Sequence, residues 1–567
     1  MPTLDWIGKQ AVVNHHREVP YRLIHCDSDL SAGDPDAGNL LVQGDNLQAL
    51  RALLPYYAGK VKCIYIDPPY NTGNEGWVYN DNVNSPEIRK WLGEVVGKES
   101  EDLSRHDKWL CMMYPRLRLL REFLREDGVI FISLDDNEIE NLLGAAQEVF
   151  GKQNWIGTII WKNVTDNNPS RIVVEHEYIV GFARKKSALP KSWKSPVSQV
   201  KDKLVEKGRE LVDSIPDDND LQREFSKWYR EQKQYLWPLD RYKFIDRDGV
   251  FTGSQSVHNP GREGYRFDIC HPDTGLPCKQ PAMGYRFPEK TAREMERDGR
   301  FIFGKDESKI VEIKLYAHEY EDKLPSVIQM DGRLGSNEIA SIFPEKRRIF
   351  DYPKPSQLIK ELLSFVTSDD DLVLDSFSGS GTTGHAVASV NKDDGGSRRF
   401  ILVEMKEDIA HGVTAERLRR VINGYNKAGD PEKPVEGLGG GFRYCRLGEP
   451  LFDEFGDIAS EVRFPDLAAH IFFTETGVPI PQKATTEFLG VYQDRAVYLL
   501  FDEASAHTPR EAAGNVLTPD RLAQLPEPPA GFDGARVVYA EGCTVSADRL
   551  KASGTTFKQI PYQVEGV

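Results

Sequence analysis

Long apolar runs are absent from this sequence of 567 residues. No stretch approaches the roughly 20 apolar residues that a membrane-spanning helix needs. The first 21 residues include Trp6, Lys9 and Arg17 but no apolar core, so we expect no secretory signal. The seven cysteines are scattered and odd in number, which favours a reducing cytoplasm over a disulfide framework. We therefore expect a cytoplasmic protein without membrane spans.

A general excess of basic residues is also absent, because the formal net charge is −16. Such a charge argues against nucleic-acid binding, since phosphate contacts need Lys and Arg. The balance is uneven along the chain, however. Residues 184–350 hold 32 Lys and Arg against 28 Asp and Glu, whereas residues 426–567 hold 13 against 21. The acidic total is therefore compatible with a basic face in the middle of the chain.

The length exceeds what one core supports, and we expect several domains. Strand-like and helical patterns alternate in two separate parts of the chain, 39–185 and 346–436. This alternation predicts one doubly wound α/β domain, with a mixed, loop-rich α+β domain inserted at 186–345. An N-terminal extension, 1–38, precedes these parts. A glycine cluster then opens a mixed, acidic C-terminal domain, 437–567.

Hydrophobic periodicity places the elements of the α/β domain. The strands are expected at 40–42, 61–66, 129–132, 372–374 and 400–403, and the helices at 45–54, 114–125, 135–150, 356–366 and 382–390. The inserted domain instead crowds aromatic and basic residues, as in Trp228-Tyr229-Arg230, and repeats Gly-Tyr-Arg-Phe at 264–267 and 284–287. Ligands of parallel α/β sheets lie beyond the carboxyl ends of the strands. The loops after 61–66 and 372–374 are therefore the first places to look for a site.

Asp67-Pro68-Pro69-Tyr70 follows the first of these strands. Each proline fixes its own backbone and restricts the residue before it, so Asp67 and the Pro68 carbonyl can be held as two acceptors that point to one place. Two acceptors match the two hydrogens of an exocyclic amino group, and Tyr70 offers a ring on which a base can stack. Such hydrogen bonds would stabilise positive charge on the nitrogen as it attacks a methyl sulfonium. The alternative is a proline turn that only closes a strand.

Asp375-Ser376-Phe377-Ser378-Gly379-Ser380-Gly381-Thr382-Thr383 follows the second strand. Its glycines allow backbone N–H groups to approach a ligand, at the N-terminus of the next helix. Glu404 ends the following strand, where a carboxylate can accept both hydroxyls of a ribose. A tight turn or an NAD or nucleotide site is the alternative, although the loop lacks the G-x-G-x-x-G spacing and a P-loop lysine.

Two weaker candidates lie elsewhere. Cys270-His271 and Cys278 could bind zinc, but a fourth ligand at regular spacing is missing, so we predict no metal site. His176 precedes a strand-like run, where a structural role is the simpler interpretation.

Together these motifs resemble the β-class amino-methyltransferases of DNA, in which a catalytic Asp-Pro-Pro-Tyr precedes a Phe-x-Gly-x-Gly cofactor loop. Residues 377–381 match that loop without departure, residues 354–359 (Lys-Pro-Ser-Gln-Leu-Ile) match the PKP-type segment, and residues 44–47 (Gly-Asp-Asn-Leu) are similar to the G-D-N/C motif. The likeness extends over about residues 1–425. It is greatest to the adenine-N6 Mod subunits of type III restriction–modification systems.

The resemblance implies S-adenosylmethionine as the cofactor. The cofactor-binding residues would be Asp45, Lys354, Pro355, Asp375, Phe377, Gly379, Gly381, Thr382, Thr383 and Glu404. The catalytic residues would be Asp67, Pro68, Pro69 and Tyr70. His176 falls where the family has a segment that lines the base pocket.

The same resemblance implies a Rossmann-like methyltransferase sheet with an inserted target-recognition domain. It implies methylation of the N6 amino group of a flipped-out adenine in a specific double-stranded DNA sequence. A homodimer, a restriction (helicase-nuclease) subunit as partner, and dimer or partner contacts by the C-terminal domain are further expectations. The alternatives are a cytosine-N4 or RNA amino-methyltransferase and a non-catalytic DNA-specificity subunit. Asp at the first motif position favours adenine, since Ser-Pro-Pro-Tyr is commoner for cytosine.

Overall fold

The computed structural model divides the chain into two compact units, one of residues 1–191 and 325–567 and one of residues 192–324. The structure describes residues 4–72, 90, 93–96, 104–164, 171–195, 199–233, 236, 239–254, 257–259, 261–346, 348–453, 457–502 and 515–560. None of the described helices has the length and apolar content that a bilayer crossing requires.

A ten-stranded sheet forms the centre of the first unit. Its order is β1 (Arg22–Gly33), β18 (Gly441–Pro450), β2 (Leu40–Gln43), β15 (Arg399–Glu404), β14 (Leu372–Asp375), β3 (Val61–Ile66), β4 (Leu124–Leu134), β6 (His176–Ala183), β5 (Trp155–Lys162) and β13 (Val327–Gln329). The strands from β18 to β4 are mutually parallel, whereas β6 is antiparallel to both of its neighbours. After β3 the next strand of the sheet is β4, on one side of the pair formed by β3 and β14. After β14 the next strand is β15, on the other side of that pair. This order confirms the doubly wound α/β domain and places its switch point between β3 and β14.

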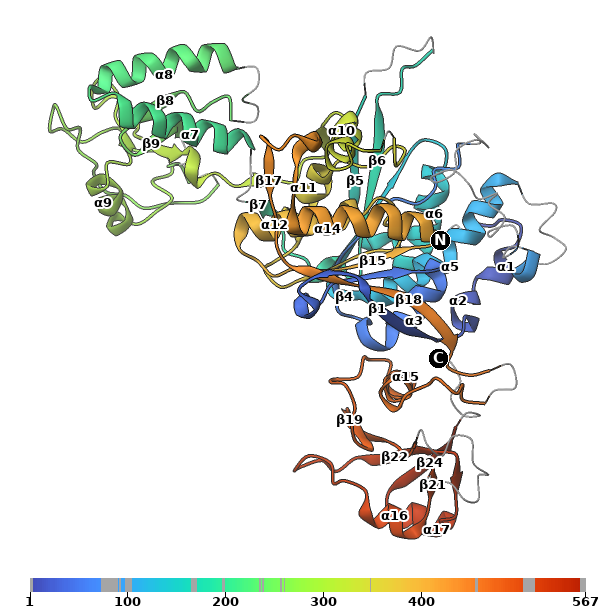
Figure 1. Cartoon of the computed structure of the whole chain (residues 1–567). Helices are drawn as coiled ribbons and strands as arrows, with labels where there is room; N and C mark the ends of the chain where they lie inside the picture. Colours follow the sequence, from blue (N-terminus) through green and yellow to red (C-terminus); the bar gives the residue numbers. More distant parts are fainter. Residues whose placement is uncertain are drawn as a thin grey trace. The chain divides into compact units, whose positions relative to one another are not determined.

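Helices cover both faces of this sheet. Every residue of β3 and β14 is buried, as expected for parallel strands packed on two sides. One group of packed helices comprises α3 (Asn46–Tyr57), α5 (Arg105–Phe123) and α6 (Ile139–Phe150), and another comprises α11 (Ser356–Val366), α12 (Thr382–Asp394) and α14 (Glu416–Asn423). Figure 1 shows these helices around the sheet.

The predicted bounds of β3 and α11 are confirmed, and those of several other elements are wrong at their ends. Helix α5 begins at Arg105 rather than Tyr114, because Ser104 and Asp107 form a capping box at its N-terminus. Helix α6 begins at Ile139 rather than Asp135, because the Asp135 carboxylate accepts the Asn137 backbone N–H in a preceding turn.

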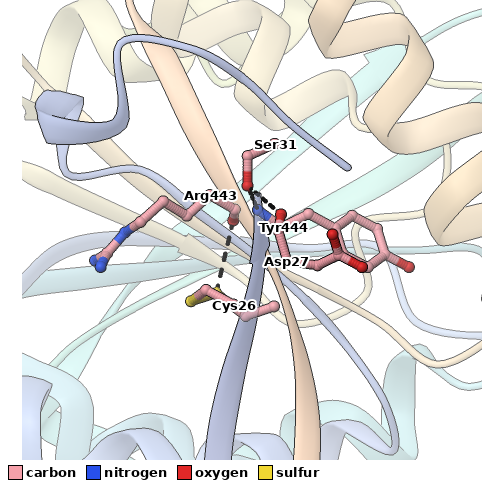
Figure 2. Close-up of a disulfide and its surroundings, with 6 residues drawn as sticks. Cys26, Asp27, Ser31, Arg443 and Tyr444 are labelled. Carbon is pink, nitrogen blue, oxygen red and sulfur yellow. Dashed lines mark hydrogen bonds between the residues drawn. A yellow bond between two sulfur atoms is a disulfide. The ribbon is translucent and has the colours of Figure 1, made fainter. Parts of the chain in front are cut away.

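A disulfide links the two strands at one edge of the sheet. Cys26 of β1 lies directly opposite Cys445 of β18, with 3.9 Å between their Cα atoms. Figure 2 shows the surroundings of Cys26, including the Ser31 hydroxyl, which accepts the Tyr444 backbone N–H at 3.0 Å. The expectation that the cysteines form no disulfide is therefore wrong for this pair. Strand pairing brings together two residues that are 419 positions apart, which spacing in the sequence does not reveal.

The second unit, 192–324, contains two helices that the sequence analysis missed, α7 (Gln199–Ser214) and α8 (Asp218–Gln232), drawn in green in Figure 1. A four-stranded sheet accompanies them, in the order β10 (Phe301–Ile302), β11 (Glu312–Tyr316), β9 (Gly249–Ser254) and β8 (Phe244–Asp246). The two Gly-Tyr-Arg-Phe repeats pair with each other through backbone hydrogen bonds between Tyr265 and Tyr285. The α+β character expected of this segment is present.

The C-terminal residues beyond β18 add a smaller sheet to the first unit. Its order is β19 (Phe488–Tyr492), β20 (Arg495–Leu499), β22 (Ala535–Ala540) and β24 (Thr555–Gln559), and it packs with α15 (Phe464–Thr476). The carboxylate of Glu475 at the end of α15 accepts hydrogen bonds from Arg495, Tyr539 and Lys558, which ties the helix to three of these strands. β18 itself belongs to the main sheet, although the sequence analysis assigned its residues to the C-terminal domain.

Candidate active site

One cavity lies beyond the carboxyl ends of β3 and β14. These strands are parallel neighbours, so their following loops emerge side by side at the switch point. Asp67 and Gly379 both line this cavity. The complete lining comprises Tyr65, Asp67, Phe350, Tyr352, Pro353, Lys354, Ile359, Asp375, Phe377, Ser378, Gly379, Ser380, Thr382 and Thr383. The structure thus brings the two sequence motifs together in one place.

The glycine loop turns sharply from β14 into α12. Gly379 and Gly381 have φ values of 47° and 78°, a region that glycine adopts readily and most other residues do not. Asp375 fixes the loop, because its carboxylate accepts the Phe377 backbone N–H at 2.9 Å and the Thr383 hydroxyl at 2.5 Å. Thr382 and Thr383 begin the helix and are buried. Burial raises the pKa of Asp375 to about 7, although both hydrogen bonds oppose the shift.

Glu404 closes the same loop from the end of β15. Its carboxylate accepts backbone N–H groups from Gly379 at 3.1 Å and from Lys406 at 2.9 Å. The side chain is buried, and burial raises its pKa to about 8 against the effect of these hydrogen bonds.

Two residues that carry no sequence motif support the glycine loop from α14 and from the π-helical segment before it, Ala410–Ala415. The Thr414 hydroxyl donates to the Gly379 carbonyl at 2.6 Å. The Arg417 guanidinium, which is fully buried, donates to the Thr382 hydroxyl at 2.8 Å and pairs with Glu338 at 2.7 Å. No sequence motif marks either residue, because each acts through the folding of a distant helix against the loop.

Asp45 lies at the start of α3, where its carboxylate caps the helix by accepting the Gln48 backbone N–H at 3.0 Å. Arg116 donates to Asp45 at 3.2 Å and to Asn46 at 2.5 Å. Asn46 in turn donates to the Ser376 carbonyl at 3.0 Å. The Gly-Asp-Asn segment therefore adjoins the glycine loop through Asn46.

The Asp67–Tyr70 segment is held by neighbouring elements. The Trp109 indole N–H of α5 donates to the Pro69 carbonyl at 2.7 Å. Pro68 is buried, and the Tyr70 hydroxyl donates to Glu177 of β6 at 2.7 Å. Burial raises the pKa of Asp67, Lys354 opposes this shift, and Glu177 adds to it.

Lys354 extends into this group of residues. Its ammonium contacts both oxygens of Asp67, at 3.0 and 2.8 Å, and the Tyr70 hydroxyl at 2.8 Å. It lies 3.3 Å from Glu177. Burial would lower the pKa of Lys354, but Asp67 and Glu177 outweigh that effect and raise it. The next residue, Pro355, is the N-cap of α11.

Glu177 is the clearest residue that the sequence analysis overlooked. It follows His176, which falls where the family has a segment that lines the base pocket, but the Glu177 carboxylate is the group that reaches Tyr70 and Lys354. Asn163 also donates to Glu177, at 2.6 Å. The sequence feature that could have indicated Glu177 is its charge near the start of a largely apolar strand.

The histidine of the weak zinc candidate contacts a backbone carbonyl. The His271 ring lies 3.2 Å from the Gly304 carbonyl, within hydrogen-bond distance. Within the described part of the chain, no group of three or more His, Cys, Asp or Glu side chains is arranged to hold a metal ion.

Comparisons with known proteins give consistent matches. A family model described as DNA methylase matches residues 61–416. The Mod subunit of the type III restriction–modification enzyme EcoP15I of Escherichia coli is 44% identical over 445 residues, which cover 76% of this chain and 68% of that protein. The Mod subunit of the StyLTI enzyme of Salmonella typhimurium is 28% identical over 505 residues, which cover 84% and 70%.

Solved structures show weaker likeness. The cytosine-N4-specific PvuII DNA methyltransferase aligns with 13% identity and a TM-score of 0.31, over 68% of this chain and 89% of that one. The complex of M1.HpyAVI with SAM aligns with 12% identity and a TM-score of 0.28, over 67% and 98%.

Proposed function

The chain belongs to the DNA methylase family that includes the Mod subunits of type III restriction–modification enzymes, and we propose that it methylates the N6 amino group of adenine in double-stranded DNA. S-adenosylmethionine is the methyl donor. The observation that carries this proposal is the single cavity lined by both Asp67 and Gly379. A base site and a cofactor site that share a cavity allow direct transfer without a covalent enzyme intermediate.

The residues of the glycine loop suit the cofactor. Gly379 and Gly381 allow a close approach to the backbone, and the buried Glu404 carboxylate at the end of β15 would accept the hydroxyls of a ribose. Asp375, Thr382 and Thr383 hold the loop and the helix N-terminus beside them. Asp45 and Pro355 fix the two flanking helices, and Phe377 offers an aromatic face. The bound cofactor supplies an electrophilic methyl group on a positively charged sulfur.

The Asp67–Tyr70 segment suits the target base. Asp67, with the Pro68 carbonyl as the second acceptor, receives hydrogen bonds from the two N–H groups of the amine, and Tyr70 stacks on the ring. In the reaction, a bond forms between N6 and the methyl carbon while the carbon–sulfur bond breaks. The nitrogen then loses a proton, which Asp67 can accept because burial raises its pKa. The adenine must leave the duplex to reach this position, at a cost of a few kcal/mol.

The same proposal assigns functions to the second unit and to the C-terminal residues. The unit of residues 192–324, which falls within the segment 186–345, reads the DNA sequence through its aromatic and basic residues. The C-terminal residues mediate contacts with a second copy or with a restriction (helicase-nuclease) subunit. A DNA substrate places the enzyme in the cytoplasm of a bacterial cell.

Transfer of tritium from labelled S-adenosylmethionine into duplex DNA tests the proposal, with Asp67→Ala as the matched variant. We expect incorporation into adenine by the wild type and none above background by the variant. Incorporation into cytosine or preferential incorporation into RNA would assign one of the alternative methyltransferase activities. Sequence-specific DNA binding without any transfer would make the protein a specificity subunit.

A further inference from the structure

The ammonium group of Lys354 contacts Asp67, the carboxylate that the proposed function assigns to the target base. It contacts both carboxylate oxygens of Asp67 and the Tyr70 hydroxyl, all within 3.0 Å. Asp67 is one of the two acceptors that the amino group of a target adenine would meet under the proposed function. An ammonium has three N–H donors and no acceptor, so it can satisfy the same acceptors as an exocyclic amine.

The aromatic surroundings of Lys354 point in the same direction. Its ammonium nitrogen lies 4.8 Å from the centroid of the Tyr70 ring and 5.7 Å from the centroid of the Trp161 ring. Trp161 is buried, and its indole N–H donates to the Met330 carbonyl at 2.9 Å, which fixes the ring. A cation held beside aromatic faces is a favourable arrangement, and the same faces can stack on a nucleobase.

The space around this group is small. The cavity lined by Asp67, Lys354 and the glycine loop has a volume of about 20 Å³, little more than the ~10–15 Å³ that one water molecule needs. A purine does not fit in this volume, so base binding requires lining side chains to move. Lys354, which is 8% exposed, is the lining residue that contacts Asp67 directly.

We propose that Lys354 holds the place of the target amino group: its ammonium satisfies Asp67, Tyr70 and Glu177 in the empty enzyme and is displaced when the flipped adenine enters. The lysine then belongs to the base site rather than to the cofactor site that its motif predicts. Its single positive charge lies beside two neighbouring, partly buried carboxylates, at 2.8 Å from Asp67 and 3.3 Å from Glu177. This inference rests on the proposed function of Asp67.

Base extrusion can be measured without cofactor by the fluorescence of 2-aminopurine placed at the target adenine, once sequencing of methylated DNA has located that base. Lys354→Met removes the charge and keeps an unbranched side chain of similar length, and Lys354→Arg is the matched control that keeps the charge. We expect Lys354→Met to raise the emission above wild type and to tighten duplex binding about threefold, because no ion pair must open. Lys354→Arg should keep the low emission of the wild type. Lower or unchanged emission in Lys354→Met would overturn the proposal.

A second measurement does not depend on the folding of a variant. In a crystal structure of the wild type with its target duplex, the Lys354 nitrogen should lie more than about 4 Å from Asp67, beyond ion-pair distance, with the adenine amino group in its place. An ammonium that remains on Asp67 beside the bound base would contradict displacement. If either test fails in an enzyme that methylates adenine, only the proposed role of Lys354 is rejected. A wild type that transfers no methyl group would reject the proposed function itself.

Discussion

At the scale of one residue, we expect Glu404 to make the proposed cofactor site sensitive to pH. Its pKa of about 8 means that the carboxyl group is mostly protonated at pH 7 in the free enzyme. Ribose hydroxyls donate best to the ionised form, so cofactor binding should release a proton. We expect affinity for S-adenosylhomocysteine to rise with pH by at most about tenfold per unit and to level off above about pH 8. Calorimetry in buffers with different ionisation enthalpies measures both the affinity and the proton release.

Glu404→Gln is the matched control, because the amide keeps one acceptor and cannot titrate. The variant should bind more weakly and show a flatter pH dependence. The free energy of unfolding changes with pH in the opposite direction to the cofactor affinity. A folded-state pKa raised from the usual 4.5 to about 8 means that the folded chain binds the extra proton, so this contribution to stability falls as pH rises through that range. An affinity that declines between pH 6 and 8 would contradict the proposed contact.

The sequence predicts the catalytic and cofactor motifs but not the residues that position them. Asp67 and Gly379 meet because two parallel strands end side by side, and in sheets of this class ligands bind where neighbouring strands end at the switch point. Glu177 and Arg417 reach the site from β6 and α14, and only the packing of those elements decides which side chains touch the loops. The direction of the Lys354 side chain is likewise set by tertiary contacts with the two carboxylates.

At the scale of elements, the disulfide between β1 and β18 gives a direct test of the strand pairing. Of the seven cysteines in the chain, five are free in the structure. We therefore expect five reactive thiols in denatured, unreduced protein and seven after reduction. Cys26→Ser should lower the free energy of unfolding by on the order of 2–5 kcal/mol, because the link closes a long loop in the unfolded chain.

Cys63→Ser is a poor control because Cys63 is buried in the core, whereas Cys270 is exposed and Cys270→Ser should leave stability unchanged. Seven reactive thiols before reduction would contradict the link. The disulfide could not be predicted from the sequence, because it depends on which strand pairs with β1. A hydrophobic pattern predicts where strands occur but not which strand lies next to an edge strand.

At the scale of the whole molecule, we expect that the second unit can be deleted while the first unit stays folded. The strands β7 (Lys194–Ser195) and β12 (Asp322–Lys323) pair at the two ends of this unit, so its entry and exit lie together. A short Gly-Ser linker can therefore join Lys191 to Pro325. We expect this deletion to keep cofactor affinity within about twofold, because the lining of the shared cavity lies wholly in the first unit. Sequence-specific DNA affinity should fall by on the order of 10³ or more, to the level of non-specific binding.

Calorimetry with cofactor and fluorescence anisotropy with specific and scrambled duplexes measure these two effects. A deletion variant that still distinguishes the two duplexes would contradict the role of residues 192–324 in recognition. Loss of cofactor binding would show that the two units depend on each other.

Analysis of the nucleosides formed in duplex DNA is the most direct test of the central claim that Asp67 and the glycine loop form one adenine-methylating site. After incubation with S-adenosylmethionine, mass spectrometry should detect N6-methyladenine for the wild type. Asp67→Ala, which keeps the glycine loop, should bind cofactor normally and lose at least about 10² of the rate. Formation of N4-methylcytosine, or unchanged N6-methyladenine with Asp67→Ala, would contradict the account.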